Sequence, residues 1–109
     1  MPCTVLLTED AAEDLQELYT FIARHDSPGK ADHVLEQIEK RFVSLSELPE
    51  RGVCPKELQS LGIRDYREIF FKPYRIIYRV YAENIYIYLI VDGRRDMQTF
   101  LQRRLLGAL

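Results

Sequence analysis

The chain has 109 residues, of which 47% are hydrophobic and 29% are charged, and its formal net charge is −2. These proportions are typical of a soluble globular protein and exclude a disordered chain. The length predicts a single domain, residues 1–109, with one core. The longest unbroken apolar run, Ile85–Val91, is far too short to span a membrane, and the first apolar run stops at Leu7 without the form of a signal peptide. We therefore expect a cytoplasmic protein with no membrane partner.

Cysteine and histidine are sparse. Cys3 and Cys54 form no CxxC motif, which favours a reduced environment, and we expect Cys54 to be an incidental free thiol. His25 and His33 belong to no pattern of metal ligands and are expected on helix surfaces. The sequence thus predicts no metal and no cofactor.

Charge is distributed unevenly along the chain. Residues 1–64 hold seven Lys and Arg against twelve Asp and Glu, a balance of −5, whereas residues 65–109 hold eight against five, a balance of +3. The basic part is the strand-rich C-terminal part, which suits contact with a nucleic acid or an acidic partner. The excess is too modest to predict tight polyanion binding.

The first half of the chain predicts one strand and two helices. Pro2–Leu7 reads as a short strand, and Thr8 is a suitable N-cap for a helix that extends to about Arg24. Ser27 caps a second helix, with Pro28 at its first position, that ends at Leu48-Pro49. Because the connection is short, the two amphipathic helices should form an antiparallel hairpin.

The second half predicts a loop, three strands and a short helix. Glu50–Gly62 reads as loop from its Pro and Gly content, and the closing helix begins near Met97 and is loosened by Gly107. The three strands are expected at Asp65–Phe71, Tyr74–Tyr81 and Ile85–Asp92. The order β-αα-βββ-α predicts an α+β fold: an N-terminal strand, an antiparallel helical hairpin packed on a small, mainly antiparallel sheet, and a short C-terminal helix.

A two-residue loop at Glu83-Asn84 would fix the pairing of the last two strands. The face that covers the helices would then pair Val80 with Ile87, Tyr78 with Leu89, and Ile76 with Val91. The other face would place Arg75 opposite Asp92 and Arg79 opposite Tyr88.

Two interpretations of this arginine-bearing face remain open. Arg75 could form a cross-strand ion pair with Asp92 while Arg79 makes a cation–π contact with Tyr88. The face could instead receive an anion or a partner peptide, for which the candidate residues are Arg75, Arg79, Arg94, Arg95 and Tyr88.

Three segments resemble the RelE/ParE superfamily of bacterial type II toxins: LPERG at residues 48–52, YREIFFKPYRIIYRV at 66–80 and VDGRRD at 91–96. With the element order, the resemblance covers nearly the whole chain. It implies a toxin, for example of a plasmid stabilisation module, that is neutralised by an antitoxin from the neighbouring gene. RelE-like members cut mRNA on the ribosome, whereas ParE-like members poison DNA gyrase.

Only some of the catalytic residues of RelE-like members have a counterpart in this chain. The resemblance matches the family's strand arginine to Arg75 and the arginine after the last strand to Arg95, with Arg94 adjacent. The family's two lysines would fall near Arg67 and Ile69, and its proton-transferring tyrosine or histidine near Phe100–Leu101. Since the base and acid are missing, the proton-transfer equipment is incomplete.

We therefore expect a ParE-like gyrase inhibitor that is not an enzyme. The alternative is a RelE-like mRNA interferase that uses Arg75, Arg95 and Arg67, with the ribosome and mRNA as partners. A third hypothesis is a degenerate toxin that acts only as a binding partner in an autoregulatory complex.

An antitoxin's amphipathic segment needs an apolar surface on which to dock. Candidate contacts are Phe42, Val43, Leu101 and Leu105, although core packing explains most of them equally well. A homodimer and a toxin–antitoxin hetero-oligomer both remain open.

Overall fold

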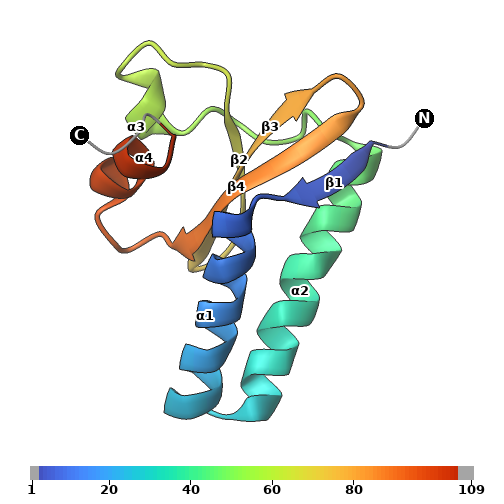
Figure 1. Cartoon of the computed structure of the whole chain (residues 1–109), viewed down its shortest axis with the longest axis vertical. Helices are drawn as coiled ribbons and strands as arrows, with labels where there is room; N and C mark the ends of the chain where they lie inside the picture. Colours follow the sequence, from blue (N-terminus) through green and yellow to red (C-terminus); the bar gives the residue numbers. More distant parts are fainter. Residues whose placement is uncertain (1–2, 106–109) are drawn as a thin grey trace.

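A computed structural model describes residues 3–105 (Figure 1). Its elements are β1 (Thr4–Leu7), α1 (Glu9–His25), α2 (Pro28–Glu47), α3 (Lys56–Gln59), β2 (Arg67–Phe71), β3 (Tyr74–Tyr81), β4 (Asn84–Asp92) and α4 (Met97–Leu105). The α+β class, the N-terminal strand, the helical hairpin and the short C-terminal helix are confirmed. The prediction that Glu50–Gly62 is all loop was wrong, because α3 lies within it. Gly107 lies outside the described residues.

Local capping accounts for the two long helices. The Thr8 side chain accepts a hydrogen bond from the backbone N–H of Ala11 at 3.1 Å, and Ser27 does the same for Lys30 at 3.1 Å. Each cap satisfies a backbone donor that the first helical turn leaves without a partner. The caps explain why α1 and α2 begin where the sequence predicts.

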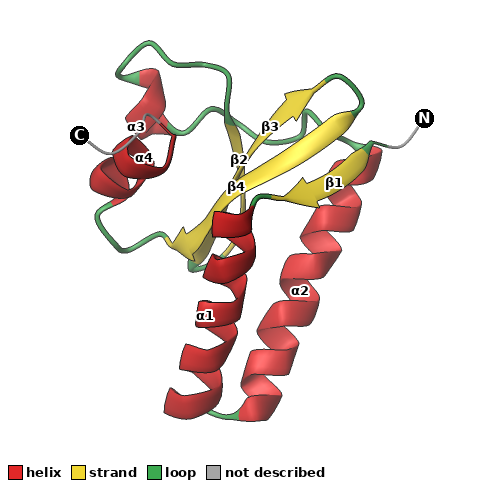
Figure 2. Cartoon of the chain, in the orientation of Figure 1, coloured by secondary structure: helices red, strands yellow, loops and turns green. Residues whose placement is uncertain are grey.

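The four strands form one sheet in the order β1-β4-β3-β2 (Figure 2). β1 runs parallel to β4, and the other neighbouring pairs are antiparallel. The hairpin of α1 and α2 packs on one face and projects beyond the sheet, whereas α3 and α4 lie on the other side of the molecule (Figure 1). One face of the sheet is therefore covered by the helical hairpin, and part of the other, outer face is covered by α3 and α4.

The predicted register of the β3–β4 hairpin was wrong. The turn is Ala82-Glu83, with Ala82 at φ 56°, and Tyr81 pairs with Asn84. Asn84 belongs to β4 because it also pairs with Thr4 of the parallel strand β1. The left-handed backbone at Ala82 is what a tight two-residue hairpin turn requires.

A β-bulge then changes the register within the hairpin. Tyr78 pairs with Ile87, and the next residue, Ile77, pairs with Leu89, so that Tyr88 has no partner in β3. An extra residue in one strand reverses the face on which the following side chains lie. Leu89 and Val91 therefore lie on the face opposite to the one predicted.

The bulge lets β4 contribute to two hydrophobic clusters. The larger one fills the space between the sheet and the helical hairpin and includes Ile76, Tyr78 and Ile87. The smaller one lies beneath α3 and α4 and consists of Leu58, Ile77, Leu89, Val91, Met97 and Leu101. Because the smaller cluster holds α3 and α4 on the sheet, it determines the surroundings of the arginines that the sequence singles out.

Candidate functional site

Arg75 is buried. Only 8% of its surface is exposed, and its Nε donates a hydrogen bond to Glu68 Oε1 at 2.7 Å. Its two terminal nitrogens donate to the two carboxylate oxygens of Glu57 at 2.9 and 2.8 Å. The predicted ion pair with Asp92 was wrong, because the bulge moves Asp92 opposite Tyr74. Arg75 pairs with Glu57 instead, which α3 carries over this part of the sheet.

The pKa values of the two carboxylates are shifted in opposite directions. The hydrogen bonds from Arg75 lower the pKa of Glu57. Burial raises the pKa of Glu68, even though Arg75 acts in the opposite direction. The hydrogen bond to Glu57 is the main cause that raises the pKa of Arg75. The guanidinium is thus fully engaged inside the protein, where a lone charge would be costly.

Two glycines in the resembling segments make room for buried side chains. A Cβ on Gly93 would lie 2.7 Å from Cδ of Arg75, and a Cβ on Gly52 would lie 2.7 Å from the Tyr78 hydroxyl oxygen. That hydroxyl donates to Pro49 O at 2.8 Å and accepts from Gly52 N–H at 2.9 Å. The resembling segments LPERG, YRIIYRV and VDGRRD therefore interlock in space, which gives them a structural role in this chain.

Arg79 lies on the part of the outer sheet face that α3 and α4 leave open. Its guanidinium lies 5.9 Å from the ring centroid of Tyr66 and 6.0 Å from that of Tyr81. The predicted contact with Tyr88 was wrong, because the bulge shifts Tyr88, which packs edge-on against Tyr66. Arg79 and the three tyrosines form a basic aromatic surface on the outer sheet face.

Arg67 also makes its hydrogen bonds within the protein. It donates from one terminal nitrogen to the carbonyl oxygens of Glu50 and Gly52, at 3.0 and 2.8 Å. These contacts hold the LPERG segment against β2. Arg67 therefore stabilises the same loop that encloses Tyr78.

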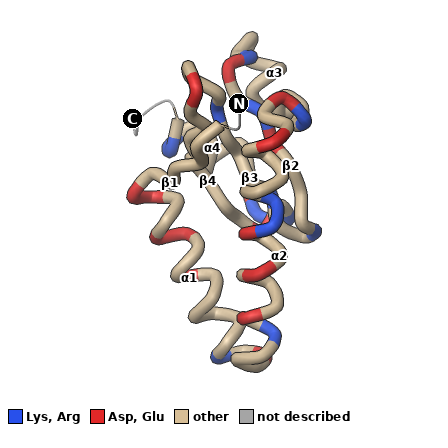
Figure 3. The backbone as a smooth tube through the Cα atoms, turned by 90° about the vertical axis from the view of Figure 1, so that its right-hand side faces the viewer, with Lys and Arg blue, Asp and Glu red and all other residues tan. Residues whose placement is uncertain are grey.

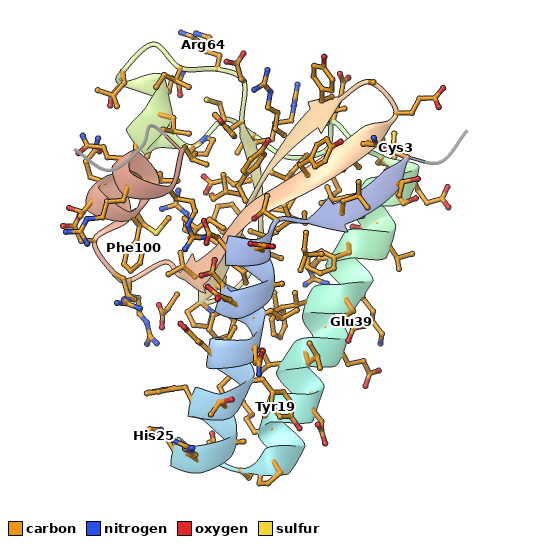
Figure 4. All side chains as sticks on the ribbon, viewed as in Figure 1. Cys3, Tyr19, His25, Glu39, Arg64 and Phe100 are labelled. Carbon is orange, nitrogen blue, oxygen red and sulfur yellow. The ribbon has the colours of Figure 1, made fainter. Side chains whose placement is uncertain are left out.

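Arg94 and Arg95 follow β4 and remain exposed. Arg94 pairs with Asp92, and its hydrogen bonds lower the pKa of that carboxylate. The Arg95 guanidinium lies over the ring of Phe100, 4.5 Å from its centroid. Phe100 projects from α4 toward the loop after β4 (Figure 4).

A cleft of about 630 Å³ opens beside these arginines, between α1, the end of β4 and α4. Its lining residues are Asp14, Glu17, Leu18, Phe21, Tyr74, Ile90, Val91, Asp92, Arg94, Arg95, Phe100 and Arg104. The size is within the range of ligand-binding sites, and the lining mixes aromatic groups with both signs of charge. We refer to it below as the β4 cleft.

Sequence inspection missed the ion pair that borders the β4 cleft. Arg104 of α4 donates to Asp14 of α1 at 2.8 and 3.0 Å and to the carbonyl oxygen of Tyr88 at 2.8 Å. Asp14 also accepts the backbone N–H of Ile90 at 3.0 Å. Asp14 and Arg104 are 90 positions apart in the sequence, so no local pattern indicates this contact, which ties both helices to the bulged strand.

The candidate antitoxin contacts differ in exposure. Val43 is 65% exposed on α2, whereas Leu101 is 1% exposed in the smaller cluster. Phe42 and Leu105 are half-buried against the larger and the smaller cluster, respectively. The structure thus assigns Leu101 to the core and leaves Val43 as the exposed member of the set.

The histidines are exposed, and His25 lies at the tip of the helical hairpin, away from the sheet (Figure 4). Within residues 3–105 no group of three or more His, Cys, Asp or Glu side chains is placed to hold a metal ion. No helix among the described residues is both long enough and apolar enough to cross a bilayer.

Acidic residues recur along α1 (Figure 3), whereas Arg94 and Arg95 follow β4. The β4 cleft lies where these two regions meet, with Glu17 on the α1 side and Arg95 on the other. Such a cleft can bind a partner that presents both signs of charge.

The sequence matches known toxins over most of its length. The model of the family described as "ParE toxin of type II toxin-antitoxin system, parDE" matches residues 5–97. Toxin ParE3 of Caulobacter vibrioides is 27% identical over 100 residues, which are 92% of this chain and 96% of that protein.

Solved structures have the same fold. The chromosomal ParDE system of P. aeruginosa matches with a TM-score of 0.68 and 20% identity, covering 83% of this chain and 95% of that one. The RelBE2 complex of Mycobacterium tuberculosis matches at 0.58 and 24%, covering 84% and 99%. A double mutant of E. coli toxin RelE in the free state matches at 0.65 and 16%, covering both chains fully. At these identities the structural likeness concerns the fold alone.

Proposed function

This chain belongs to the ParE toxin family of type II toxin–antitoxin systems, and from that premise we propose that it inhibits DNA gyrase without being a nuclease. We further propose that it acts in the cytoplasm and that a cognate antitoxin, encoded by the adjacent reading frame, neutralises it. The family match supports the toxin assignment, and the similarity to Toxin ParE3 over most of both chains agrees with it.

The observation that carries the non-nuclease proposal is the environment of Arg75. A phosphate in an RNA-cleaving site needs cations that are free to approach it and groups that transfer protons. Both terminal nitrogens of Arg75 are instead bonded to Glu57, and its Nε is bonded to Glu68. An RNA phosphate would have to displace a buried bidentate carboxylate in order to reach this guanidinium.

The other positions that the RelE chemistry would use support the same proposal. Arg67 donates to two backbone carbonyls, and Phe100, which has no ionisable group, lies near the expected proton-transfer position. Arg95 alone among the three matched arginines has an exposed guanidinium over an aromatic ring. One exposed cation without an acid or a base does not make a cleavage site.

The proposal is tested by incubating the purified chain with gyrase, supercoiled plasmid and ATP. We expect reduced supercoiling and an accumulation of plasmid cleaved by gyrase, and we expect no ribosome-dependent cleavage of a defined mRNA. Arg95→Ala should leave the fold intact, so that loss of gyrase inhibition in this variant would assign a contact rather than a folding defect. The matched control is Arg64→Ala, which removes another exposed arginine.

Each alternative predicts a different result. Unaffected gyrase would contradict the gyrase proposal. Ribosome-dependent mRNA cleavage would favour the interferase alternative instead. If expression without the antitoxin fails to arrest growth, the toxin activity itself is contradicted and the degenerate-toxin hypothesis is supported.

A further inference from the structure

The strand registers define the part of the outer sheet face that α3 and α4 leave open. Arg79 of β3 pairs with Tyr86 of β4, and Tyr86 pairs in turn with Leu6 of β1, so these three side chains lie on one face. Tyr66 extends the row beyond Arg79, because its ring centroid lies 5.9 Å from the guanidinium. The row crosses the sheet near the β3–β4 turn, which lies away from α3 and α4 in Figure 1.

Several large side chains on this face are exposed. Tyr81 is 63% exposed, and the aliphatic side chains of Leu6 and Val53 are 40% and 60% exposed. Val53 belongs to the same face, since it bridges Glu68, which pairs with the outward-facing residue Ile77. Exposed apolar and aromatic side chains that gather on one face mark a site of interaction with another molecule.

Arg79 is the charged side chain at the centre of this row. Within residues 3–105 it takes part in no ion pair, and its guanidinium contacts the rings of Tyr66 and Tyr81. The neighbours that the registers place around it on this face are all uncharged: Thr4, Leu6, Tyr81, Asn84 and Tyr86. The planar donor group is therefore available to a carboxylate, and the rings beside it offer apolar contact.

The composition of this face distinguishes a protein from a nucleic acid as the occupant. Surfaces that bind nucleic acids are strongly basic and contact several phosphates, whereas the row across this sheet carries one cation. The centre of a protein–protein interface is instead poor in charge and rich in Tyr and Arg, which contribute most to binding. The basic aromatic surface has this second composition.

A second copy of the chain does not complement this face. In a symmetric dimer the same patch lies on both sides of the interface, so that two Arg79 guanidiniums would share it with no carboxylate among the neighbours named above. The occupant must therefore bring a carboxylate of its own. The broad face of a sheet also suits a folded protein, whereas an amphipathic segment needs a groove.

We propose that the basic aromatic surface is the face through which this chain binds DNA gyrase, with a gyrase carboxylate on Arg79 and an apolar gyrase side chain against Tyr81. This inference rests on the proposed function and adds the place of contact to it. The contrast with Arg75 and Arg67 supports the assignment, because both of these arginines donate hydrogen bonds within the protein.

The test measures the binding of the intact chain to purified gyrase by calorimetry, together with the inhibition of supercoiling. Arg79→Glu should raise the dissociation constant about tenfold or more, because it places a second carboxylate opposite the first. Tyr81→Ser removes an exposed ring without touching the core and should raise the dissociation constant about fivefold or more. Both substitutions should weaken inhibition in the same order.

The matched control is Arg24→Glu, which reverses an exposed charge in the last turn of α1 and should change the dissociation constant less than about twofold. Circular dichroism and thermal unfolding should show that the three variants keep the fold. If Arg79→Glu does not fold, Tyr81→Ser decides the question alone.

The results that would overturn the inference are distinguishable. If the parent chain inhibits gyrase and Tyr81→Ser binds gyrase as the parent does, the basic aromatic surface is excluded while the proposed function stands. If the parent chain neither binds nor inhibits gyrase, both are overturned. A different occupant is shown if the substitutions weaken only the binding of a DNA duplex, only the antitoxin complex or only a dimer seen in sedimentation.

Discussion

Arg75 and Arg95 are matched to the same expected site by family resemblance, yet their surroundings differ in almost every respect. Arg75 is 8% exposed and donates hydrogen bonds to two carboxylates. Arg95 is exposed and contacts one aromatic ring. The comparison teaches that a motif arginine indicates chemistry only together with its partners: Arg75 joins α3 to the sheet, and Arg95 remains available to another molecule.

The difference between Arg75 and Arg95 is tested most directly by removing each guanidinium in turn. Arg75→Met leaves Glu68, whose side chain is 6% exposed, without its cation, and should lower the free energy of unfolding by about 3–5 kcal/mol. Arg95→Met should change it by less than about 0.5 kcal/mol. Urea denaturation measures both. Equal effects of the two substitutions would contradict the structural role of Arg75.

The Arg75 cluster also predicts a dependence of stability on pH. Arg75 lowers the pKa of Glu57, so this carboxylate contributes stability above its unfolded pKa of about 4.3, and that stability is lost as the pH falls through the lower folded pKa. Glu57→Gln should cost about 1.5–3 kcal/mol at pH 7, with a difference from the parent protein that shrinks below about pH 4.

The control for this experiment is Glu39→Gln, which alters an exposed carboxylate on α2. Glu68, with its raised pKa, has the opposite linkage: its contribution is present below the unfolded pKa and is lost as the pH rises. Both proteins retain Glu68, but the charge of Glu57 contributes to the raised pKa of Glu68, so comparing Glu57→Gln with the parent reports Glu57 together with its effect on Glu68. A constant difference from pH 7 to pH 3 would contradict the assignment.

Two glycines sharpen the contrast between the interlocked motif segments and the exposed surface. A Cβ on Gly52 would lie 2.6 Å from the carbonyl oxygen of Glu68, so Gly52→Ala should destabilise the protein by about 1–3 kcal/mol. Gly29 has nothing within 4 Å and lies in α2, so Gly29→Ala should stabilise by about 0.5–1 kcal/mol. Thermal unfolding would reveal the opposite signs, and a shared sign would count against this packing.

A small effect is expected for Arg79, whose exposure lies between that of Arg75 and that of Arg95. It is partly exposed and contacts the rings of Tyr66 and Tyr81. Arg79→Ala should lower the free energy of unfolding by less than about 1 kcal/mol. A loss above about 2 kcal/mol would show that Arg79 belongs with Arg75 as a structural arginine, and Arg64→Ala serves as the exposed control.

The sequence predicted the elements better than their pairing. Thr8 and Ser27 marked the helix starts, and the strand Tyr74–Tyr81 has the predicted bounds. In IYIYLIV the residues of both parities are apolar or aromatic, so alternation cannot reveal a bulge at Tyr88. Helix α3 was missed because it has only four residues, too few for a helical period.

The candidate site was harder to predict because its partners are distant in the chain. Glu57 comes from the segment predicted as loop, and no local pattern relates it to Arg75. One signal was present in REIFF, where Glu68 directly precedes the apolar residues Ile69–Phe71, since a carboxylate that is buried with such neighbours needs a cation. Asp14 and Arg104, which border the β4 cleft, carried no comparable signal.

The bulge at Tyr88 separates the residues of β4 that the two hydrophobic clusters require from the one residue that they do not. Deleting Tyr88 would remove the bulge and leave Ile87 and Leu89 opposite the adjacent residues Tyr78 and Ile77. Leu89, Ile90 and Val91 would then keep the faces on which they lie now, because regular alternation from Ile87 gives the same arrangement. The pattern of both clusters is therefore compatible with a strand one residue shorter, and Tyr88 is the position at which β4 should tolerate a deletion.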